Sequence, residues 1–303
     1  MIKMKKCVIL TMDDCSAYEV YDHLLIEPLN QAGWLCDTIS WRANNINWND
    51  YQLVMVRSPW DYQLDCDAFV KVLKEIDDSS AHLDNPLTIM KWNINKHYLR
   101  ELATQGIEIV PTLWFDDITA QDIPRFFSGV TNFDNYINYN SQEIVIKPCI
   151  SAGAFDTYRL TLEQAVEKQS ELLTIFKQRE FMVQPFVESI ISEGEFSLFY
   201  FDDEFSHAIL KTPQNNDYRV QEEFGSLIVK IDPELSLKQH AEKVLSVINS
   251  SLLYARLDFA RTATGFALME AELIEPSLYF NFDKDSPQRF VNAVERRMRR
   301  LEL

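Results

Sequence analysis

The sequence predicts an α/β (α+β) protein with about two domains. Short apolar runs alternate with helical patterns up to about residue 90, and the chain becomes strongly β from residue 195. Alternating strands and helices are typical of a mostly parallel sheet with helices packed on it. The length of 303 residues agrees, because a domain averages roughly 150 residues.

The N-terminal part is expected to form a small, mostly parallel sheet. Cys7–Met12 and Leu53–Val56 are apolar runs of strand length. Two helices are predicted by apolar residues at helical spacing, which are Val20, Leu24, Leu25 and Leu29, then Phe69, Val72, Leu73 and Ile76. Ligands of such sheets lie beyond the carboxyl ends of the strands, where Arg57–Tyr62 stands. Asn85-Pro86 marks the end of this part.

The middle of the chain mixes helices with isolated strands. A helix is predicted over Asn93–Ala103, and strands over Glu143–Lys147 and Phe181–Gln184. Residues 116–142 are polar and rich in turn-forming residues, with no clear periodicity. A further helix is expected to begin at Thr161, because Gln164 three residues later completes a capping box. Its apolar stripe is Leu162, Ala165, Val166, Leu172, Leu173 and Phe176.

The last third is predicted to contain two β-hairpins and two helices. The strands are Phe196–Phe201 with Phe205–Lys211, Leu227–Ile231, and Tyr254–Arg261 with Gly265–Leu273. One helix begins near Ser236, and another ends the chain. The terminal helix carries Arg296, Arg297, Arg299 and Arg300 near its C-terminus, where cations suit the helix dipole. We interpret this basic cluster as structural.

Composition excludes several classes of protein. Lys and Arg total 29 and Asp and Glu total 46, which gives a net charge of −17. A nucleic-acid binder needs clustered cations, so this balance argues against one. No apolar run approaches the roughly 20 residues of a membrane span, and the five cysteines form no CxxC pair, so a reduced, cytoplasmic protein is expected. With 7 glycines and no GxGxxG or Walker A loop, a nucleotide must be held in another way.

Three carboxylates in the last hairpin are the clearest chemical signal. Alternation along a strand places Glu270 and Glu272 on one face, and a turn centred near Thr264 would pair Asp258 with Glu270. Clustered carboxylates favour a cation, and oxygen ligands suit Mg²⁺ shared with phosphates. The alternative is a solvated face on which Arg256 pairs with Glu270.

Two lysines end apolar strands and form a second signal. Lys147 follows Ile144–Ile146, and Lys211 follows Ala208–Leu210. A lysine at a strand end can direct its ammonium at a phosphate. It can equally extend its ammonium into solvent, as many strand-end lysines do.

These motifs together resemble the ATP-grasp ligases. Lys147–Thr157 is similar to the phosphate-covering loop of that family, and Phe181–Val187 to its adenine-binding hinge. Glu270-x-Glu272 followed by Pro276 resembles the family's E-x-N metal motif. Three further segments are most similar in sequence to the branch that contains the cycloserine-forming cyclo-ligase, which is related to glutathione-synthetase-like enzymes. These segments are Arg57–Tyr62, Phe205–Ala208 and Tyr218–Gly225.

The resemblance implies an ATP-grasp fold behind a Rossmann-like pre-ATP-grasp domain. The implied divisions are residues 1–92 for that first domain, 93–186 for the central subdomain, and 187–303 for a C-terminal subdomain with the metal site. The implied activity is an ATP- and Mg²⁺-dependent ligation of a small, amino-acid-like carboxylate to an amine through an acyl-phosphate, releasing ADP and phosphate. Relatives are commonly dimeric, so a homodimer is the assembly to test.

The resemblance also assigns roles to individual residues. Lys96, Lys147 and the Ser151 segment would hold the ATP phosphates, and Lys211 would reach the transferred phosphate. The adenine and ribose would be bound by Gln184, Phe186, Val187 and Glu195. Asp258, Glu270 and Glu272 would bind Mg²⁺. Arg219 would stabilise the charge of the reacting acyl group and contact the substrate.

Some substrate contacts remain open at this point. Arg57 is a candidate for the substrate carboxylate, because Arg binds carboxylates in a bidentate manner; the alternative is an ion pair with Asp61. Trp60 is the one tryptophan expected near a substrate. Glu275 could be a third metal ligand or a substrate contact.

Two departures from the family pattern keep other functions open. Glu272 stands where the family has Asn, and the phosphate-covering loop has the single glycine Gly153. A nucleotide-binding regulatory protein without catalysis and a kinase that releases its phosphorylated product are therefore alternatives. Substrate identity and the choice between cyclisation and intermolecular ligation are not specified by the sequence.

Overall fold

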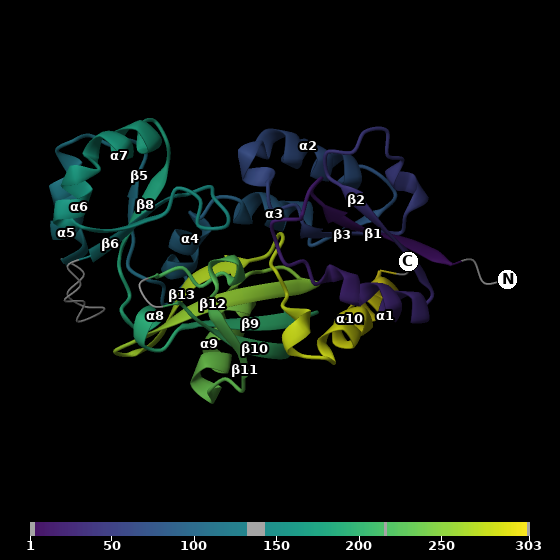
Figure 1. The fold of residues 1–303 in the computed structure, drawn as a ribbon. Coiled ribbons are helices and arrows are strands. Elements are labelled where there is room, and N and C mark those ends of the chain that lie inside the picture. The colour runs from purple at the N-terminus through teal and green to yellow at the C-terminus, as the bar shows by residue number, and fades with distance from the viewer. Residues whose placement is uncertain (1–3, 132–142, 215–216, 302–303) are drawn as a thin grey trace.

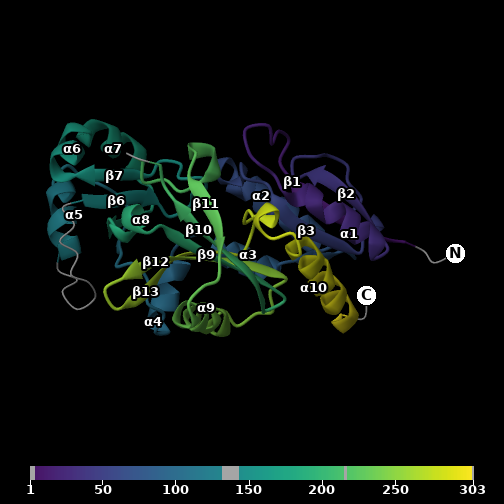
Figure 2. The ribbon, with the colours of Figure 1, turned by 60° about the horizontal axis from the view of Figure 1, so that its bottom comes forward.

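The computed structural model describes residues 4–131, 143–214 and 217–301. It contains three sheets with helices packed around them, and the third sheet lies between the other two in both ribbon views (Figures 1 and 2). The predicted α/β class is confirmed. In the part of the chain that is described, no helix combines the length and the apolar character that crossing a bilayer requires.

The first sheet is fully parallel and has the order β2-β1-β3-β4. Its strands are β1 (Lys5–Thr11), β2 (Trp34–Ser40), β3 (Leu53–Ser58) and β4 (His82–Asp84). Alternate residues of β1 point to opposite faces. Cys7 and Ile9 pack towards α1 (Ile26–Gln31) and α10 (Ser286–Arg300), and Val8 and Leu10 towards α2 (Cys66–Asp77). Because both faces are covered, the strand is apolar along its length.

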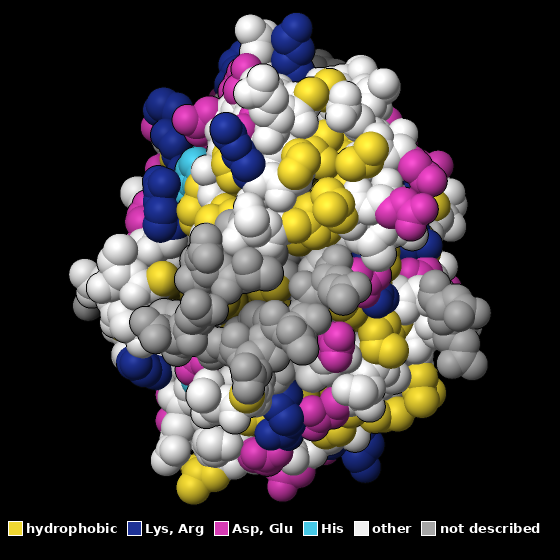
Figure 3. Space-filling view, turned by 90° about the vertical axis from the view of Figure 1, so that its left-hand side faces the viewer, with side chains coloured by type: hydrophobic (Ala, Val, Ile, Leu, Met, Phe, Trp, Pro, Cys, Tyr) yellow, Lys and Arg dark blue, Asp and Glu magenta, His cyan; other side chains and the backbone are white. Residues whose placement is uncertain are grey.

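The second sheet is antiparallel and has the order β5-β8-β6-β7. Its strands are β5 (Leu113–Phe115), β6 (Glu143–Pro148), β7 (Tyr158–Thr161) and β8 (Phe181–Pro185). The helices that cover it are α5 (Asp122–Thr131), α6 (Leu162–Glu167) and α7 (Gln169–Phe176). Figure 3 shows hydrophobic side chains gathered on the upper part of this end of the molecule, and Leu162 and Val166 of α6 are 45% and 52% exposed.

The third sheet is antiparallel and has the order β11-β10-β9-β12-β13. Its strands are β9 (Glu195–Phe201), β10 (Glu204–Thr212), β11 (Leu227–Ile231), β12 (Tyr254–Thr262) and β13 (Gly265–Glu272). The remaining α-helices are α3 (Leu87–Asn93), α4 (Tyr98–Thr104), α8 (Ser189–Ser192) and α9 (Leu235–Val247). The short 3-10 turns are η1 (Asp22–Leu25), η2 (Trp48–Asp50), η3 (Tyr62–Leu64), η4 (Glu222–Phe224) and η5 (Phe280–Phe282).

Buried polar contacts fix the first sheet against the third. The Asn85 side chain donates to the carbonyls of Tyr254 and Leu273, and its oxygen accepts from the amide of Leu253. The hydroxyl of Tyr254 donates to the carbonyl of Val56 at 2.7 Å. Because these groups are buried, each satisfied bond holds the two sheets in one arrangement. The segment after β3 is thereby placed next to the end of β13.

Two helical predictions are corrected by the structure. Asn93–Ala103 is not one helix, because α3 ends at Asn93 and α4 begins at Tyr98. The Asn93 side chain instead bonds the backbone of Ala271 and Leu273, which turns residues 94–97 towards the third sheet. The helix that begins at Thr161 has the predicted capping box but ends at Glu167, so its predicted stripe does not run on into α7.

Some elements were not predicted. The helix α5 lies in the stretch that showed no periodicity, and residues 132–142 of that stretch lie outside the described residues. The strand β2 was not predicted, because buried and exposed side chains do not alternate regularly along it. The structural role of the C-terminal arginines is confirmed for three of them, since Arg296 and Arg300 pair with Asp202, and Arg297 pairs with Asp84.

Candidate active site

A cavity of about 530 Å³ lies where the second and third sheets meet the segment after β3. It brings together the predicted site residues Lys96, Lys147, Ser151, Gln184, Phe186, Val187, Glu195, Lys211, Arg219, Asp258, Glu270 and Glu272. Arg57 is not among its lining residues. The cavity is large enough for a small organic ligand, since such sites usually measure roughly 300–1,000 Å³.

Three lysines reach the cavity from three different elements. Lys96, between α3 and α4, lies with its Nζ 2.9 Å from Oε1 of Glu270 and donates to the carbonyl of Ser151. Lys211 of β10 pairs with Glu195 and lies 3.7 Å from Oδ2 of Asp258. Lys147 of β6 forms no ion pair with any described residue. Burial lowers the pKa of Lys147, whereas neighbouring carboxylates outweigh burial and raise the pKa of Lys96 and Lys211.

The last hairpin carries the acidic residues in the predicted register. Asp258 is opposite Glu270, and Arg256 is opposite Glu272. The turn itself pairs Thr262 with Gly265, and a bulge after Asp258 shifts the register by one residue. The predicted pairing of Asp258 with Glu270 is thus correct because of that bulge.

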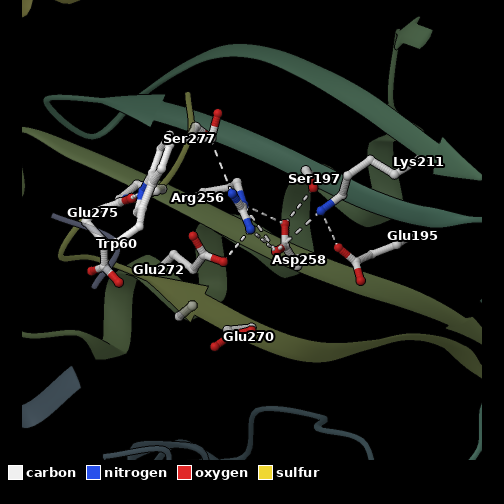
Figure 4. Close-up of polar contacts among 12 residues, drawn as sticks. Trp60, Glu195, Ser197, Lys211, Arg256, Asp258, Glu270, Glu272, Glu275 and Ser277 are labelled. Atoms are coloured by element: carbon white, nitrogen blue, oxygen red, sulfur yellow. Dashed lines mark hydrogen bonds and ion pairs between the residues drawn. The ribbon is translucent and has the colours of Figure 1, made fainter. Parts of the chain in front are cut away.

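Arg256 lies at the centre of this acidic group (Figure 4). Its Nε is 3.1 Å from both carboxylate oxygens of Asp258, and its Nη2 also donates to Glu272. The hydroxyl of Ser197 donates to Asp258 at 2.6 Å. The alternative pairing of Arg256 with Glu270 is therefore wrong. Sequence reasoning assigned Arg256 no function, although its spacing of two from Asp258 places both on one face of the strand.

The carboxylates differ in charge state. Burial raises the pKa of Asp258, but Arg256 and Lys211 outweigh it and hold the pKa below its usual value. Burial raises the pKa of Glu272 to about 8, against the opposing effect of Arg256. The pKa of Glu275 is likewise raised by burial, to about 7.

The donor set fits Mg²⁺, although each of the three proposed ligands already contacts a cation. Among residues 4–131, 143–214 and 217–301, no three His, Cys, Asp or Glu side chains converge as a ready-made metal site. Asp258, Glu270 and Glu272 supply only carboxylate oxygens, which are the ligands that Mg²⁺ prefers. Burial raises the pKa of Glu272 most, the neighbouring carboxylates add to that effect, and a bound cation would oppose both effects.

The part of the cavity lined by Phe186 and Val187 is apolar. Phe186 and Val187 are buried there, and the guanidinium of Arg159 stacks 3.7 Å from the ring centre of Phe186. The Gln184 side chain donates to the hydroxyl of Thr112 at 2.9 Å. The side-chain amide of Gln184 thus already has a protein partner. Phe186 and Val187 offer an apolar surface on which a flat ring could pack.

The loop over the cavity turns sharply with one glycine. Gly153, Ala154 and Asp156 adopt φ values of 58°, 58° and 51°. A residue other than glycine costs on the order of 1 kcal/mol in this left-handed region. The loop therefore folds back over the cavity despite its lack of glycines, at the expense of local strain.

Arg57 does not serve as the predicted substrate contact in this structure. Its side chain is fully buried, with an exposed fraction of 0%. The Nε lies 3.2 Å from Asp22, and Nη2 donates to the carbonyl of Pro276 at 2.6 Å. The alternative pairing with Asp61 is also wrong, because Asp61 pairs with Arg42. Arg57 instead ties the first sheet to the segment that follows β13.

Arg219 is placed at the mouth of the cavity. It pairs with Asp217 at 2.8 Å and stacks 3.7 Å from the ring centre of Phe224. Its guanidinium is partly exposed and lines the cavity, so a ligand can reach it.

We expect Arg256→Met to destabilise the protein by about 3–5 kcal/mol, because the buried carboxylate of Asp258 would lose its cation. Urea unfolding at pH 7 measures the change. Adding Glu272→Gln to this variant should change the stability little further, because Glu272, with a pKa of about 8, is already largely neutral at pH 7. A change below about 1 kcal/mol in Arg256→Met itself would contradict the central structural role of Arg256.

The three sheets and this cavity have the arrangement of the ATP-grasp fold, which the D-cycloserine synthetase DcsG and D-alanine–D-alanine ligase share. Comparisons with known proteins identify its relatives. Residues 7–85 match the family model of the N-terminal domain of the D-cycloserine synthetase DcsG. The chain is 27% identical over 290 residues to the cycloserine biosynthesis protein DcsG of Streptomyces lavendulae. The matched region covers 91% of this chain and 93% of that protein.

Solved structures share the fold over nearly the whole chain. The crystal structure of DcsG has a TM-score of 0.84 at 23% identity and covers 97% of this chain and 99% of that one. The D-alanine–D-alanine ligase of Bacillus anthracis has a TM-score of 0.66 at 12% identity, with coverages of 99% and 100%. The ATP-grasp ligase PsnB, solved with precursor, Mg and ADP, has a TM-score of 0.63 at 13% identity, with both coverages 96%. The predicted ATP-grasp fold is confirmed.

Proposed function

We propose that this protein is an ATP- and Mg²⁺-dependent carboxylate–amine ligase that acts through an acyl-phosphate on a small, amino-acid-like substrate. The observation that carries this proposal is the convergence of Lys96, Lys147 and Lys211 with paired carboxylates in one cavity. Phosphoryl transfer needs mainly positioning and neutralisation of charge, which such a set of cations supplies. The similar structures that hold ATP, or Mg and ADP, support this use of the cavity.

Each group has a defined task in this proposal. Lys96, Lys147 and the Ser151 segment hold the phosphates, and Gln184–Val187 with Glu195 hold the adenosine. Asp258, Glu270 and Glu272 hold Mg²⁺, which when bound neutralises phosphate charge. Glu270 would contact both Mg²⁺ and Lys96, because Lys96 already pairs with it in this structure. Glu195 would likewise contact both the ribose and Lys211.

The reaction consists of two displacements. A substrate carboxylate oxygen bonds to the γ-phosphorus of ATP, and the bond to the β-phosphate oxygen breaks, which releases ADP. The amine nitrogen then bonds to the acyl carbon, loses a proton and displaces phosphate. Lys211 lies beside the transferred group, and Arg219 and Arg256 are the guanidinium groups that line the cavity and can stabilise the developing charge.

Phosphate release from ATP and Mg²⁺ tests this function. The protein is incubated with amino acids and small carboxylates, with and without an amine donor, and each product is weighed by mass spectrometry. We expect ADP and phosphate in equal amounts and a product lighter by one water than its precursors. A phosphorylated product without free phosphate would instead show a kinase. Nucleotide binding without turnover across the panel would support a regulatory protein.

A further inference from the structure

Glu275 differs from Glu195, Asp258, Glu270 and Glu272, which also line the cavity, in forming no ion pair with a described residue. Glu195 pairs with Lys211, Glu270 with Lys96, and both Asp258 and Glu272 with Arg256. Glu275 also lines the cavity, but it ion-pairs with none of the described residues. Carboxylates removed from water are normally paired, so an unpaired one in a ligand cavity points to a missing cation.

The surroundings of Glu275 suit an organic cation. The indole Nε1 of Trp60 donates to the Glu275 carbonyl at 2.8 Å, and the hydroxyl of Tyr62 hydrogen-bonds to its carboxyl group. Tyr18 packs edge-on against Trp60, with ring centres 5.3 Å apart. All four residues line the cavity. A carboxylate and aromatic rings that line one cavity can together bind an ammonium group, the carboxylate by an ion pair and a ring by a cation–π contact.

The neighbouring Gln63 adds a further acceptor. Its side-chain oxygen Oε1 is buried and has no hydrogen-bond partner among the described residues, and Gln63 lines the same cavity. A buried acceptor without a partner is costly, so a ligand with N–H donors would satisfy it. This observation is independent of the charge of Glu275.

The position of Glu275 separates it from the phosphate end of the cavity. In Figure 4, Glu275 lies beside Trp60, on the far side of Glu272 from Asp258 and Lys211. The lysines that we assign to phosphates therefore lie at one end, and the unpaired carboxylate lies at the other. Arg256 lies between the two ends.

We propose that Glu275, together with Trp60 and Tyr62, binds a positively charged ammonium group of the substrate and so determines its specificity. This proposal rests on the proposed function, because that function assigns the opposite end to ATP. The raised pKa of Glu275, about 7, agrees with a carboxyl that lacks its counter-ion. The segment after β3 thus contributes directly to substrate recognition.

Two isosteric probes test the proposal without turnover. Glycinamide carries an ammonium group, and propionamide has a methyl group in the same position. Binding of both to the full chain is measured by saturation-transfer NMR at pH 7, in the presence of ADP and EDTA. We expect wild type to bind glycinamide at least tenfold more tightly than propionamide. Glu275→Gln should lose this preference, and the charge-matched control Glu163→Gln should keep it, because Glu163 is exposed on α6 and does not line the cavity.

Several results would overturn the proposal. These are equal binding of the two amides by wild type, no binding of glycinamide, or an unchanged preference in Glu275→Gln. Calorimetric titration with ADP and Mg²⁺ adds a separate readout, which should change less than twofold in Glu275→Gln. A tenfold loss there, with the amide preference retained, would make Glu275 a metal ligand. Because these readouts need no catalysis, absence of ligase activity would contradict the proposed function alone.

Folding of the variant is checked independently. The pKa of Glu275 is raised from 4.5 to about 7, so the folded state binds the proton more tightly than the unfolded state. The contribution of this carboxyl to stability is therefore full at acidic pH and is lost as the pH rises towards 7. Glu275→Gln should be at least as stable as wild type at pH 8, which thermal unfolding measures.

Discussion

Lys147→Met should abolish substrate-dependent phosphate release, with a fall in kcat/KM of roughly 10²–10³-fold or more. Lys147 ends the buried strand β6 in the cavity, and it is the one of the three cavity lysines that ion-pairs with no described residue. Its ammonium group therefore has no direct carboxylate partner among the described residues until an anion binds. Burial lowers its pKa, and a bound phosphate would reverse this effect.

The folding of this variant separates a binding role from a structural one. Methionine keeps the aliphatic length of the side chain and removes an unpaired buried charge, so the free energy of unfolding should stay equal or increase. Lys168→Met is the matched control, because Lys168 is a half-exposed lysine on the surface, and it should retain full turnover. Phosphate release within fivefold of wild type in Lys147→Met would contradict the assigned role.

The third sheet shows how far local patterns predict this fold. Both hairpins and the strand Leu227–Ile231 follow from alternation and turn residues. Alternation determines which face a side chain occupies, and therefore the clustering of acids was predictable. The bulge after Asp258, which places Asp258 opposite Glu270, was not predicted, because alternation within one strand does not show a register shift between two strands.

Long-range contacts explain the failures. Arg57 stands at the end of a strand, as a ligand-binding residue would, but Asp22 and the carbonyl of Pro276 surround its guanidinium. Pro276 lies more than 200 positions after Arg57 in the chain. In the same way, α3 ends at Asn93, whose side chain bonds the backbone of Ala271 in β13 and of Leu273 directly after it. A single sequence shows neither partner.

Arg256 and the Trp60 segment show which site residues needed the structure. The spacing of Arg256 and Asp258 was visible, but the position of Glu272 opposite Arg256 requires the register of the hairpin. Trp60 and Tyr62 belong to the first sheet's loop and reach the cavity only because Asn85 and Tyr254 hold the sheets together. The roles assigned to individual residues stay predictions that mutation can test.

Glu270→Gln should lower ATP turnover in the presence of Mg²⁺ by roughly 10²–10³-fold. Glu270 lies opposite Asp258 and contacts Lys96 at 2.9 Å. Burial would raise its pKa, but Lys96 and Lys147 outweigh burial and keep the pKa below its usual value. It is therefore charged at neutral pH and available to a metal. The amide keeps the shape of the side chain and removes the charge that a hard cation needs.

The sign of the effect on nucleotide binding distinguishes a metal ligand from a structural partner of Lys96. Without Mg²⁺, Glu270→Gln should bind ADP as well as wild type or more tightly, because a negative charge near the phosphates is removed. With Mg²⁺, wild type should gain affinity and the variant should not, which isothermal calorimetry measures in both buffers. Glu163→Gln, at an exposed position of α6, should behave as wild type. Equal gains from Mg²⁺ in wild type and Glu270→Gln would remove Glu270 from the metal site and leave it as the counter-ion of Lys96.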